Sequence, residues 1–160
     1  MNSFKIGIGY DIHRFASQRR LFIGGLLIPF KRGLLGHSDA DVLLHALCDA
    51  LLGALGEGDI GEHFPEDDPK YKNISSLVLL KNVQQLLAKK SFKVGNIDAM
   101  LLLEAPKISV FKEKMKSKIA GVLKIDKSKI SIKATTNEGV GPIGQGKAAA
   151  AYVVALIQKL

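Results

Sequence analysis

The sequence predicts one α/β (α+β) domain in which helices cover one face of a mixed β-sheet. Three observations lead to this prediction. The chain has 160 residues, enough for one substantial core but not for two. Segments with strand character alternate along it with segments whose apolar residues recur at helical spacing. No repeat and no linker divides the chain, so we assign residues 1–160 to a single domain.

The expected strands are rich in β-branched and aromatic residues and end near glycine or proline. One segment, residues 21–29, reads as a hairpin-like pair of short strands around Gly24 and Gly25. Residues 33–36 are expected to form a loop. The predicted strands cover residues 6–12, 21–29, 93–104 and 130–136.

The helices are predicted from apolar periodicity and from capping residues. Ser38 or Asp39 can cap the first helix, and Ser75 or Ser76 lies near the start of the second. Glycine, proline and acidic residues fill residues 56–72, which predicts a long loop of the kind that is usually functional or disordered. The predicted helices cover residues 41–55, 74–90 and 107–123.

The C-terminal segment, residues 147–160, gives two opposing signals. Four successive alanines favour a helix, whereas Tyr152, Val153 and Val154 favour a strand. Its intrinsic propensities therefore leave the choice open.

The composition is that of an ordinary globular protein, with 47% hydrophobic and 24% charged residues. A net charge of +8 suits nucleic acid, an anionic surface or a phosphorylated small molecule. Aromatic residues make up only 6% and tryptophan is missing, so stacking platforms for nucleic acid are scarce. Single lysines among apolar positions are typical of a solvated helix face, and we expect no nucleic-acid partner. These lysines are Lys112, Lys114, Lys116, Lys118, Lys124, Lys127 and Lys129.

No segment predicts export or membrane insertion. The longest apolar runs are interrupted or too short to cross a bilayer, and the N-terminus lacks the apolar core and cleavage site of a signal peptide. The one cysteine, Cys48, lies among leucines of a predicted helix, which indicates a buried structural thiol. We therefore expect a cytoplasmic protein without disulfides or membrane contact.

The stretch GYDIHRF, residues 9–15, places an acid and an imidazole two positions apart. In a strand, side chains at i and i+2 leave the same face, so Asp11 and His13 would share one small volume. A lone histidine such as His45, in the first predicted helix, is usually structural. With Asp11 and His13, however, it completes a three-ligand set that is typical of catalytic zinc. Asp49, one turn later, could orient His45 or be an ordinary exposed acid.

A second group of polar residues, KATTNEG, ends the strand predicted over residues 130–136. Lys133, Thr135 and Thr136 could bind phosphate oxygens, and Glu138 could hold a hard divalent ion that keeps most of its waters. The same residues could equally be an ordinary capped strand end.

Two neighbouring patterns carry less information. GVGPIG, residues 139–144, has G-x-G-x-x-G spacing, but the chain ends too soon for a dinucleotide site, which we reject. Lys107 follows Pro106, which is expected to open the third helix. The lysine and the helix N-terminus could then face an anion together.

A series of long motifs runs through the chain in a fixed order. They are DIH at 11–13, IGG at 23–25, GLLGHSDADVLLHAL at 33–47, GDIGEHFPEDDP at 58–69, APK at 105–107 and KATTNE at 133–138. Together they resemble the 2-C-methyl-D-erythritol 2,4-cyclodiphosphate synthase family of the non-mevalonate isoprenoid pathway. The resemblance implies that the 2-phosphate of 4-diphosphocytidyl-2-C-methyl-D-erythritol 2-phosphate attacks its β-phosphorus and releases CMP.

The resemblance also implies roles for individual residues. Asp11, His13 and His45 would bind Zn²⁺, with the substrate β-phosphate as fourth ligand, and Glu138 would bind Mg²⁺ or Mn²⁺. His37 and Thr136 would act on the transition state. Implied contacts to the methylerythritol phosphate part are Asp11, Ile12, His13, His37, Ser38, Asp59, Ile60, Gly61, Phe64, Pro65, Glu66, Asp67 and Asp68. Those to the cytidine and diphosphate part are Leu103, Glu104, Ala105, Pro106, Lys107, Ile108, Ser109, Ala134, Thr135, Thr136, Asn137 and Glu138.

These residue types suit the reaction without a general base. The attacking 2-phosphate is already anionic, so the enzyme mainly has to position a flexible substrate and screen repulsion between its phosphates. Zinc as a Lewis acid and magnesium across two phosphates would supply alignment and charge neutralisation.

By the same resemblance, the chain forms a homotrimer with active sites between subunits, in a fold like that of Bacillus chorismate mutase. Its C-terminal segment is then a strand, and tertiary context often overrides propensity in this way. Pro142 and Gln145 stand where many members have a phenylalanine and an arginine associated with an isoprenoid diphosphate in the trimer's central cavity. Without the arginine a diphosphate loses its bidentate partner, so we do not expect that ligand. Glu66 replaces the commoner aspartate, which lengthens reach but keeps the charge.

Two other functions differ in kind from this one. The same scaffold could catalyse a different zinc-dependent phosphotransfer or hydrolysis, which product analysis would separate. A non-catalytic trimer could instead bind a cytidine nucleotide or nucleic acid through its lysines, and tight, steeply salt-dependent binding of nucleic acid would reveal it.

Overall fold

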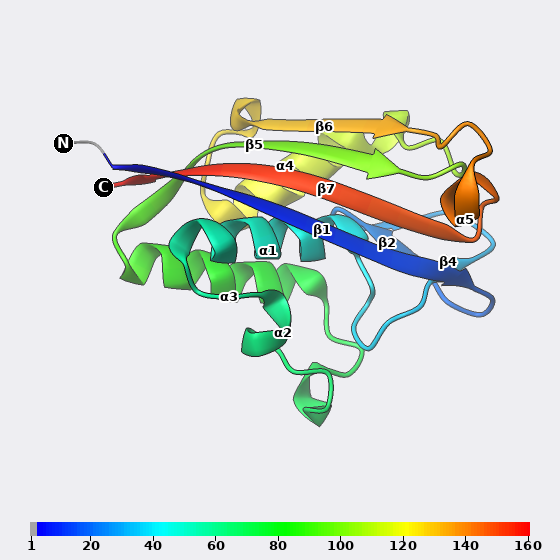
Figure 1. Cartoon of the computed structure of the whole chain (residues 1–160), viewed down its shortest axis with the longest axis horizontal. Helices are drawn as coiled ribbons and strands as arrows, with labels where there is room; N and C mark the ends of the chain where they lie inside the picture. The colour runs from blue at the N-terminus through cyan, green and yellow to red at the C-terminus, as the bar shows by residue number, and fades with distance from the viewer. Residues whose placement is uncertain (1–2) are drawn as a thin grey trace.

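A five-stranded mixed sheet forms the centre of the computed structural model, which describes residues 3–160 (Figure 1). Its strand order is β4-β1-β7-β5-β6. The strand β7 pairs antiparallel with β1 and with β5, whereas β5 and β6 run parallel. This confirms the predicted mixed sheet. The strands are β1 (Phe4–Ala16), β4 (Gly33–Leu34), β5 (Phe92–Leu102), β6 (Ile130–Thr135) and β7 (Ala148–Lys159).

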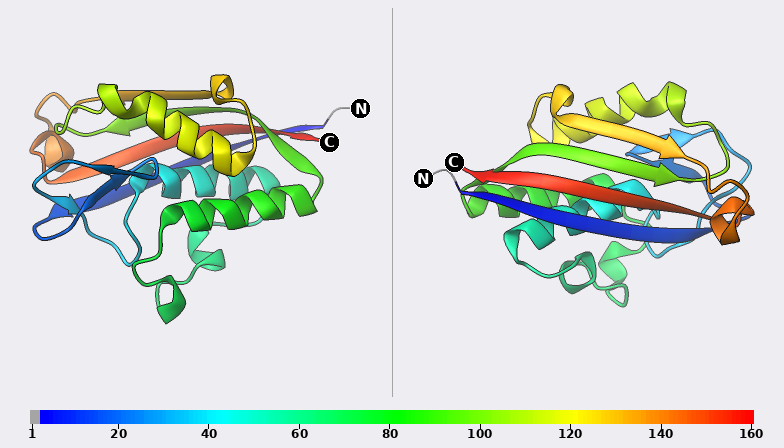
Figure 2. Two further views of the ribbon diagram at one scale, coloured as in Figure 1. Left: turned by 180° about the vertical axis from the view of Figure 1, so that it is seen from behind. Right: turned by 45° about the horizontal axis from the view of Figure 1, so that its top comes forward.

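One face of this sheet is covered by the helices α1 (Val42–Leu55), α3 (Ser76–Lys89) and α4 (Lys112–Leu123). The left-hand view of Figure 2 looks onto this covered face. The core lies between these helices and the sheet, and α1 is its centre because eleven of its fourteen residues are buried. A two-stranded hairpin, β2 (Leu21–Ile23) and β3 (Leu26–Ile28), confirms the predicted pair of short strands.

Glycines in β1 let α1 approach the sheet unusually closely. A Cβ built on Gly7 would lie 1.9 Å from the carbonyl oxygen of Ala50, and one on Gly9 would lie 1.8 Å from that of Ala46. Real Cβ atoms do not come so near, so only glycine fits at these positions. The contact brings the first turns of α1 directly against the strand that carries Asp11 and His13.

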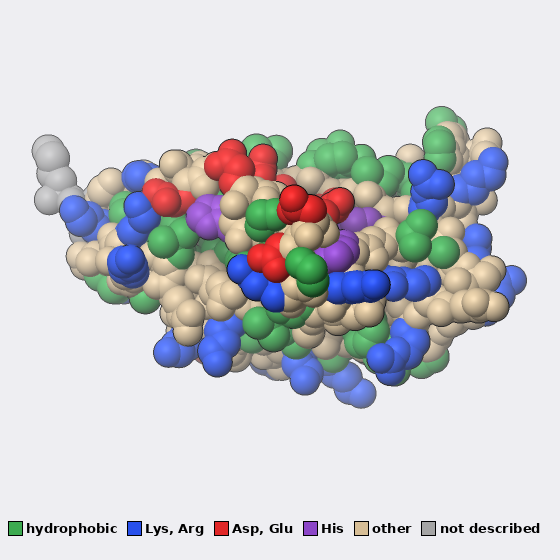
Figure 3. Space-filling model, turned by 90° about the horizontal axis from the view of Figure 1, so that it is seen from below, with side chains coloured by type: hydrophobic (Ala, Val, Ile, Leu, Met, Phe, Trp, Pro, Cys, Tyr) green, Lys and Arg blue, Asp and Glu red, His purple; other side chains and the backbone are tan. Residues whose placement is uncertain are grey.

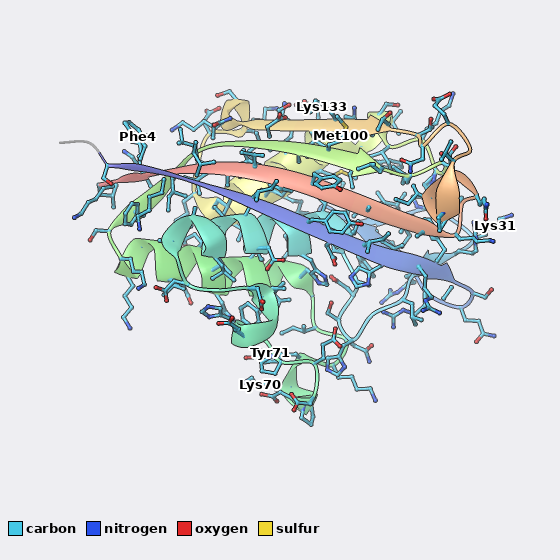
Figure 4. All side chains as sticks on the ribbon, viewed as in Figure 1. Phe4, Lys31, Lys70, Tyr71, Met100 and Lys133 are labelled. Atoms are coloured by element: carbon cyan, nitrogen blue, oxygen red, sulfur yellow. The ribbon has the colours of Figure 1, made fainter. Side chains whose placement is uncertain are left out.

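Within residues 3–160, the opposite face of the sheet carries no helix, as the right-hand view of Figure 2 shows. Apolar side chains of β1 and β7 are exposed on it, and the rings of Tyr10 and Tyr152 lie 4.7 Å apart between centroids. Lys133 and Met100 are labelled on the same side in Figure 4. We call these exposed apolar residues the outer sheet face: Phe4, Ile6, Ile8, Tyr10, Ile12, Tyr152 and Val154.

The C-terminal segment is the strand β7, as the resemblance implied. Its four alanines, Ala148 to Ala151, are all buried, and the helix α1 packs across β7 as well as β1. Small side chains suit Ala149 and Ala151, which share the face of their partners His13 and Asp11, because the helix lies close to the sheet there. Packing here outweighs the helical propensity of alanine.

Several boundaries differ from those expected. β1 extends from Phe4 to Ala16, beyond residues 6–12, and the expected loop at 33–36 contains β4. The cap of α1 is Asp41, not Ser38 or Asp39, because its carboxylate accepts from Leu44 N. Ser75 caps α3, as one of the two expected serines.

Several loop segments contain short helical turns that the sequence did not predict. Residues 56–72 include α2 (Ile60–His63) and η1 (Pro69–Tyr71), the segment before β6 includes η3 (Lys127–Lys129), and the glycine-rich loop at residues 139–144 includes α5 (Gly141–Gly144). In contrast, Pro106 does not open a helix: α4 begins at Lys112 after the turn η2 (Ser109–Phe111). Lys107 therefore does not lie at the N-terminus of α4.

Candidate active site

Asp11, His13 and His45 converge on one point. The register of β1 aims Asp11 and His13 at the face that α1 covers, and His45 lies one turn into α1. Asp11 Oδ2 is 2.9 Å from His13 Nε2 and 3.1 Å from His45 Nδ1, and the two nitrogens are 3.2 Å apart. Among residues 3–160 this is the one group of at least three such side chains placed to hold a metal ion.

The spacing of these three atoms fits a small tetrahedral cation. Ligands about 2.0–2.1 Å from zinc stand roughly 3.3 Å from one another, and the observed separations are 2.9–3.2 Å. One carboxylate and two imidazoles form a donor set that zinc accepts, with a fourth position left for a ligand.

Each imidazole ring is also held through its other nitrogen, the one that faces away from the three-residue cluster. His13 Nδ1 lies 2.9 Å from the carbonyl oxygen of Leu35, and His45 Nε2 lies 2.9 Å from Ser76 Oγ and 3.0 Å from Ser38 Oγ. The interpretation of Asp49 as the partner of His45 is wrong. Asp49 Oδ1 instead accepts from the backbone N–H of Ile60 at 2.7 Å, and so anchors the start of α2.

Proximity shifts the pKa values of Asp11 and His45. Burial alone would raise the pKa of Asp11, but hydrogen bonds and charge interactions with His13 and His45 outweigh it and lower the pKa to about 2. Burial alone would lower the pKa of His45, but Asp11 outweighs that effect and the pKa is raised. The carboxylate is therefore ionised at neutral pH, and protons compete with a metal mainly at the imidazole.

A pocket of about 120 Å³ opens beside this cluster. Of the side chains predicted for the methylerythritol phosphate part, the structure places Asp11, His13, His37, Ser38, Ile60, Gly61, Phe64 and Glu66 in its wall. His37 Nε2 is buried and has no hydrogen-bond partner within the described chain, which leaves it available to a ligand. Seen from below in Figure 3, histidines lie on either side of a group of acidic side chains, with lysines and arginines around them.

Some predicted residues lie outside this wall. Ile12 is on the outer sheet face, because neighbouring residues of a strand alternate between faces. Asp59 caps α2 by accepting from Glu62 N at 3.0 Å, and Asp68 accepts from Lys70 N. These acids belong to residues 56–72, which cover the pocket and which we call the covering segment. Pro65 and Asp67 belong to the same segment and do not line the pocket either.

The covering segment contributes a residue that sequence reasoning missed. Tyr71 lines the pocket, and its ring packs edge-on against Phe64 with centroids 5.4 Å apart. Figure 4 shows Tyr71 and Lys70 on the part of this segment that projects away from α1. Ile74 and Leu79 also line the pocket. The apolar periodicity of the second helix signals only that such residues are buried.

Arg19 is a second residue that the sequence did not single out. Its half-buried guanidinium donates to the carbonyl oxygens of Leu34, Gly36 and Ser38 at 3.1, 3.2 and 2.8 Å. These bonds hold the loop that carries His37 and Ser38. No motif signals this role, because the acceptors are backbone carbonyls.

A second pocket, of about 210 Å³, lies where β5 and β6 end. It shares no lining residue with the first pocket. The predicted residues in its wall are Leu103, Glu104, Pro106, Lys107, Ile108, Ser109, Ala134, Thr135 and Thr136. Lys112 also lines it, so this lysine is not part of a merely solvated helix face.

One hydrogen bond links the loop after β5 to the loop after β6, and another lies within the loop after β6. Asn137 N donates to Glu104 Oε1 at 2.7 Å, and Thr136 Oγ1 donates to Glu138 Oε1 at 2.8 Å. Ala105, Asn137 and Glu138 are next to the wall without lining it. Glu138 is exposed and offers one carboxylate to an ion, which would need further ligands from phosphates or water.

Lys133 does not contribute to this pocket. Its Nζ lies 2.6 Å from Asp98 Oδ2, and the pair is exposed on the same side of the sheet as Met100 (Figure 4). The interpretation of Lys133 as a phosphate ligand is therefore wrong for the chain as described, because its position in β6 directs it away from the pocket.

Pro142 and Gln145 lie in and just after α5, beyond both pocket walls, and both are exposed. Cys48 is a buried free thiol, as predicted, and burial raises its pKa. Within residues 3–160, none of the helices has the length and apolar character that crossing a bilayer requires.

Comparisons with known proteins give consistent matches. A model described as the YgbB family matches residues 4–158. The 2-C-methyl-D-erythritol 2,4-cyclodiphosphate synthase of Caldicellulosiruptor bescii is 55% identical over 154 residues, which are 96% of this chain and 98% of that protein. The synthase of the same name from Chloroherpeton thalassium is 55% identical over 156 residues, 98% of this chain and 99% of that protein.

A solved structure, IspF of Plasmodium falciparum in complex with CDP, has a TM-score of 0.87 and 36% identity, covering 99% of this chain and 98% of that one. The similarity thus extends over nearly the whole sequence and nearly the whole fold.

Proposed function

The chain belongs to the YgbB family, and from that premise we propose that it catalyses the reaction of the cyclodiphosphate synthases. The 2-phosphate of 4-diphosphocytidyl-2-C-methyl-D-erythritol 2-phosphate attacks its own β-phosphorus, the bond to CMP breaks, and a cyclic diphosphate forms. The enzyme is thus a phosphorus–oxygen lyase of isoprenoid precursor synthesis. The observation that carries this proposal is the cluster of Asp11, His13 and His45 at the edge of a pocket.

The first pocket is proposed to bind the methylerythritol phosphate part. Bound at Asp11, His13 and His45, Zn²⁺ would supply Lewis acidity at the β-phosphate, and Mg²⁺ or Mn²⁺ at Glu138 would neutralise phosphate charge. His37 is suited to bind a phosphate oxygen through its unpartnered Nε2, and Ser38 through its hydroxyl. The apolar Ile60 and Phe64 exclude water and help to fold the substrate back on itself.

The second pocket is proposed to bind the cytidine and diphosphate part. The solved relative from Plasmodium falciparum contains CDP, and this chain presents Lys107 and Lys112 at the end of β5 and β6. Thr136 is proposed to steady the transition state from the adjoining loop. Its hydroxyl donates to Glu138 Oε1 at 2.8 Å, which places it beside the carboxylate that is proposed to bind the second metal.

The proposed assembly is a homotrimer with active sites between neighbouring subunits. The outer sheet face exposes Ile6 and Ile8 to 71% and 69%, and an apolar patch of this kind usually marks an interface. The two pockets share no lining residue, which suits a site built from the first pocket of one subunit and the second pocket of the next. We also propose that the fold is like that of Bacillus chorismate mutase.

The same reasoning excludes some partners. Pro142 and Gln145 offer no guanidinium, so we propose that no isoprenoid diphosphate binds in the centre of the trimer. We expect neither nucleic acid nor a membrane as a partner. A cytoplasmic location is proposed because the one cysteine is a buried free thiol in a small-molecule enzyme.

The test is CMP release from the cytidyl substrate by purified protein supplied with both metals. We expect release to require both ions and to fall at least about 100-fold in His45→Ala. The control is Lys81→Ala, which changes an exposed residue of α3. No CMP release by the wild type, or an unchanged rate in His45→Ala, would refute the proposal. Products other than CMP and the cyclic diphosphate would indicate a different phosphotransfer.

A further inference from the structure

The edge of the His45 ring that faces away from Asp11 meets a buried chain of hydrogen bonds. Nε2 lies 2.9 Å from Ser76 Oγ, and Ser76, the first residue of α3, is fully buried. Ser76 in turn contacts Asp39, in the loop before α1. The start of α3, distant in the sequence, thus links the ring of one metal-site histidine to the loop before α1.

The contact between Ser76 and Asp39 uses both carboxylate oxygens. The backbone N–H of Ser76 donates to Asp39 Oδ2 at 2.9 Å, and the Ser76 hydroxyl donates to Oδ1. The backbone N–H of Asp41 also donates to Oδ1, at 3.1 Å. Three donors thus converge on one carboxylate, which accepts all of them.

Two acceptors compete for the proton of the neutral His45 ring: Ser76 Oγ at Nε2, and the Asp11 carboxylate 3.1 Å from Nδ1. A serine hydroxyl has a single proton, and that of Ser76 is donated to Asp39. Ser76 Oγ can therefore only accept from His45, so the contact at 2.9 Å is a hydrogen bond only if Nε2 carries the ring proton. In the neutral ring the lone pair is then on Nδ1, the nitrogen that faces Asp11 and His13.

Ser38 also contacts His45 Nε2, but it does not favour either tautomer of the ring. Its Oγ lies 3.0 Å from His45 Nε2 and accepts from Ala40 N at 3.1 Å, and its own proton is free to rotate. Ser38 can donate to Nε2 or accept from it. Ser76, whose proton is committed to a carboxylate, favours the tautomer with the proton on Nε2, whereas the Asp11 carboxylate favours a proton on Nδ1 until a metal takes that position.

We propose that Asp39 and Ser76 are positioning residues that hold His45 in the tautomer with its proton on Nε2, so that Nδ1 is free to bind the metal. The metal part rests on the proposed function, whereas the tautomer is a property of the metal-free protein. Partners behind metal-binding histidines fix tautomer and ring orientation in this way.

Zinc affinity measured by chelator competition tests the consequence. We expect Ser76→Ala to bind Zn²⁺ about 10–100-fold more weakly than the wild type. The matched control is Ser75→Ala, since that neighbouring serine contacts Leu77 N and not His45. Asp39→Asn should also weaken zinc binding, because an amide can donate to Ser76 as well as accept from it. The double variant of Asp39→Asn and Ser76→Ala should bind zinc about as weakly as Ser76→Ala alone, because Asp39 acts through Ser76. Fully additive losses would overturn the inference.

Nitrogen-15 NMR of metal-free protein tests the tautomer directly. At about pH 9, well above the ordinary histidine pKa of roughly 6.5, the His45 signals, assigned by their loss in His45→Ala, should show the proton on Nε2. In Ser76→Ala the proton should move toward Nδ1. A wild-type ring protonated on Nδ1, or weaker zinc binding with an unchanged tautomer, would overturn the inference. If zinc binding did not depend on His45 at all, the metal proposal would fail while the tautomer result would stand separately.

Discussion

The carboxylate of Asp11 and the ring of His45 show how single residues set the conditions for metal binding. A metal needs Nδ1 of His45 and Nε2 of His13 without protons, whereas Asp11 keeps its charge because its pKa lies at about 2. Interaction with Asp11 raises the pKa of His45 despite its burial, so protons compete for that nitrogen at a higher pH than they would in water.

The first prediction is therefore that zinc affinity falls as the pH is lowered. Each imidazole that must lose a proton to bind the metal lowers the zinc affinity by up to about tenfold per pH unit in acid. With two imidazoles, the affinity should fall by up to about 100-fold per pH unit there. Competition with a chelator of known pH dependence, between about pH 8.5 and pH 5.5, provides the measurement. A flat profile over that range would show that the imidazoles are not the ligands.

Asp41 is the residue on which the hairpin and α1 both depend. Its fully buried carboxylate accepts from Gly24 N, Gly25 N and Leu44 N at 2.9, 2.7 and 3.1 Å. Burial, with Asp39 nearby, raises its pKa to about 6, although these three donors oppose the shift. Gly24 and Gly25 have φ of 61° and 76°, which is the backbone that lets both N–H groups point at one acceptor.

The second prediction follows from removal of that acceptor. Asp41→Ala should destabilise the protein by about 3–5 kcal/mol, because three N–H groups lose their partner in the core. Urea denaturation of the metal-free protein measures this. Asp126→Ala, which removes an exposed cap that accepts from Ser128 N, is the control and should cost about 1 kcal/mol or less. Equal effects of the two substitutions would mean that the contacts of Asp41 are not decisive.

At the level of elements, the contact between β1 and α1 is the feature that assembles the site. Asp11 and His13 come from the strand and His45 from the helix, so the distance between the two elements decides whether three ligands meet. Gly7 and Gly9 set that distance, since any side chain there would meet backbone atoms of α1.

The third prediction is that Gly9→Ala disrupts metal binding as well as stability. The new Cβ would overlap the carbonyl oxygen of Ala46, so α1 must move and carry His45 with it. Overpacking of this kind costs about 1–3 kcal/mol or more, and zinc affinity should fall at least about tenfold. Gly121→Ala in α4, where a Cβ meets nothing within 4 Å, should leave zinc affinity unchanged. An unaltered affinity in Gly9→Ala would show that the helix position is not critical.

On the scale of the whole molecule, the outer sheet face is the surface that a second subunit would cover. The fourth prediction is that Ile8→Lys prevents assembly, because a lysine would be buried there without a partner. Sedimentation velocity should show trimers for the wild type and smaller species for the variant. Val78→Lys, a change of an apolar residue exposed on α3, is the control and should remain trimeric. A trimeric Ile8→Lys protein would place the interface elsewhere.

The fifth prediction concerns active sites shared between subunits. His45→Ala damages the first pocket and Thr136→Ala the second, so neither variant should release CMP efficiently alone. When they are co-expressed as mixed trimers, about a quarter of the sites should combine an intact first pocket with an intact second pocket. CMP release should recover in proportion. No recovery from verified mixed trimers would mean that each chain contains a complete site.

Sequence alone determined the class of fold, most helices and strands, and the three proposed metal ligands Asp11, His13 and His45. Strand alternation directs Asp11 and His13 to one face whatever the surroundings, and the spacing of HSDADVLLH places His45 on a helix. Such features depend on short stretches of sequence, so the sequence is enough to predict them. The long motifs can likewise be read directly from the sequence, and their residues are specific enough to indicate the family.

Only the tertiary structure decided which side chains face the pockets and which face elsewhere. Ile12 and Lys133 lie on the opposite side of the sheet from the pockets, Asp49 anchors α2, and Ser76 holds His45. The alanines of the last segment form a strand that pairs with β1 and β5, and α1 packs against Ala149 and Ala151. These outcomes depend on contacts between segments far apart in the chain, and local propensity and spacing contain no information about such contacts.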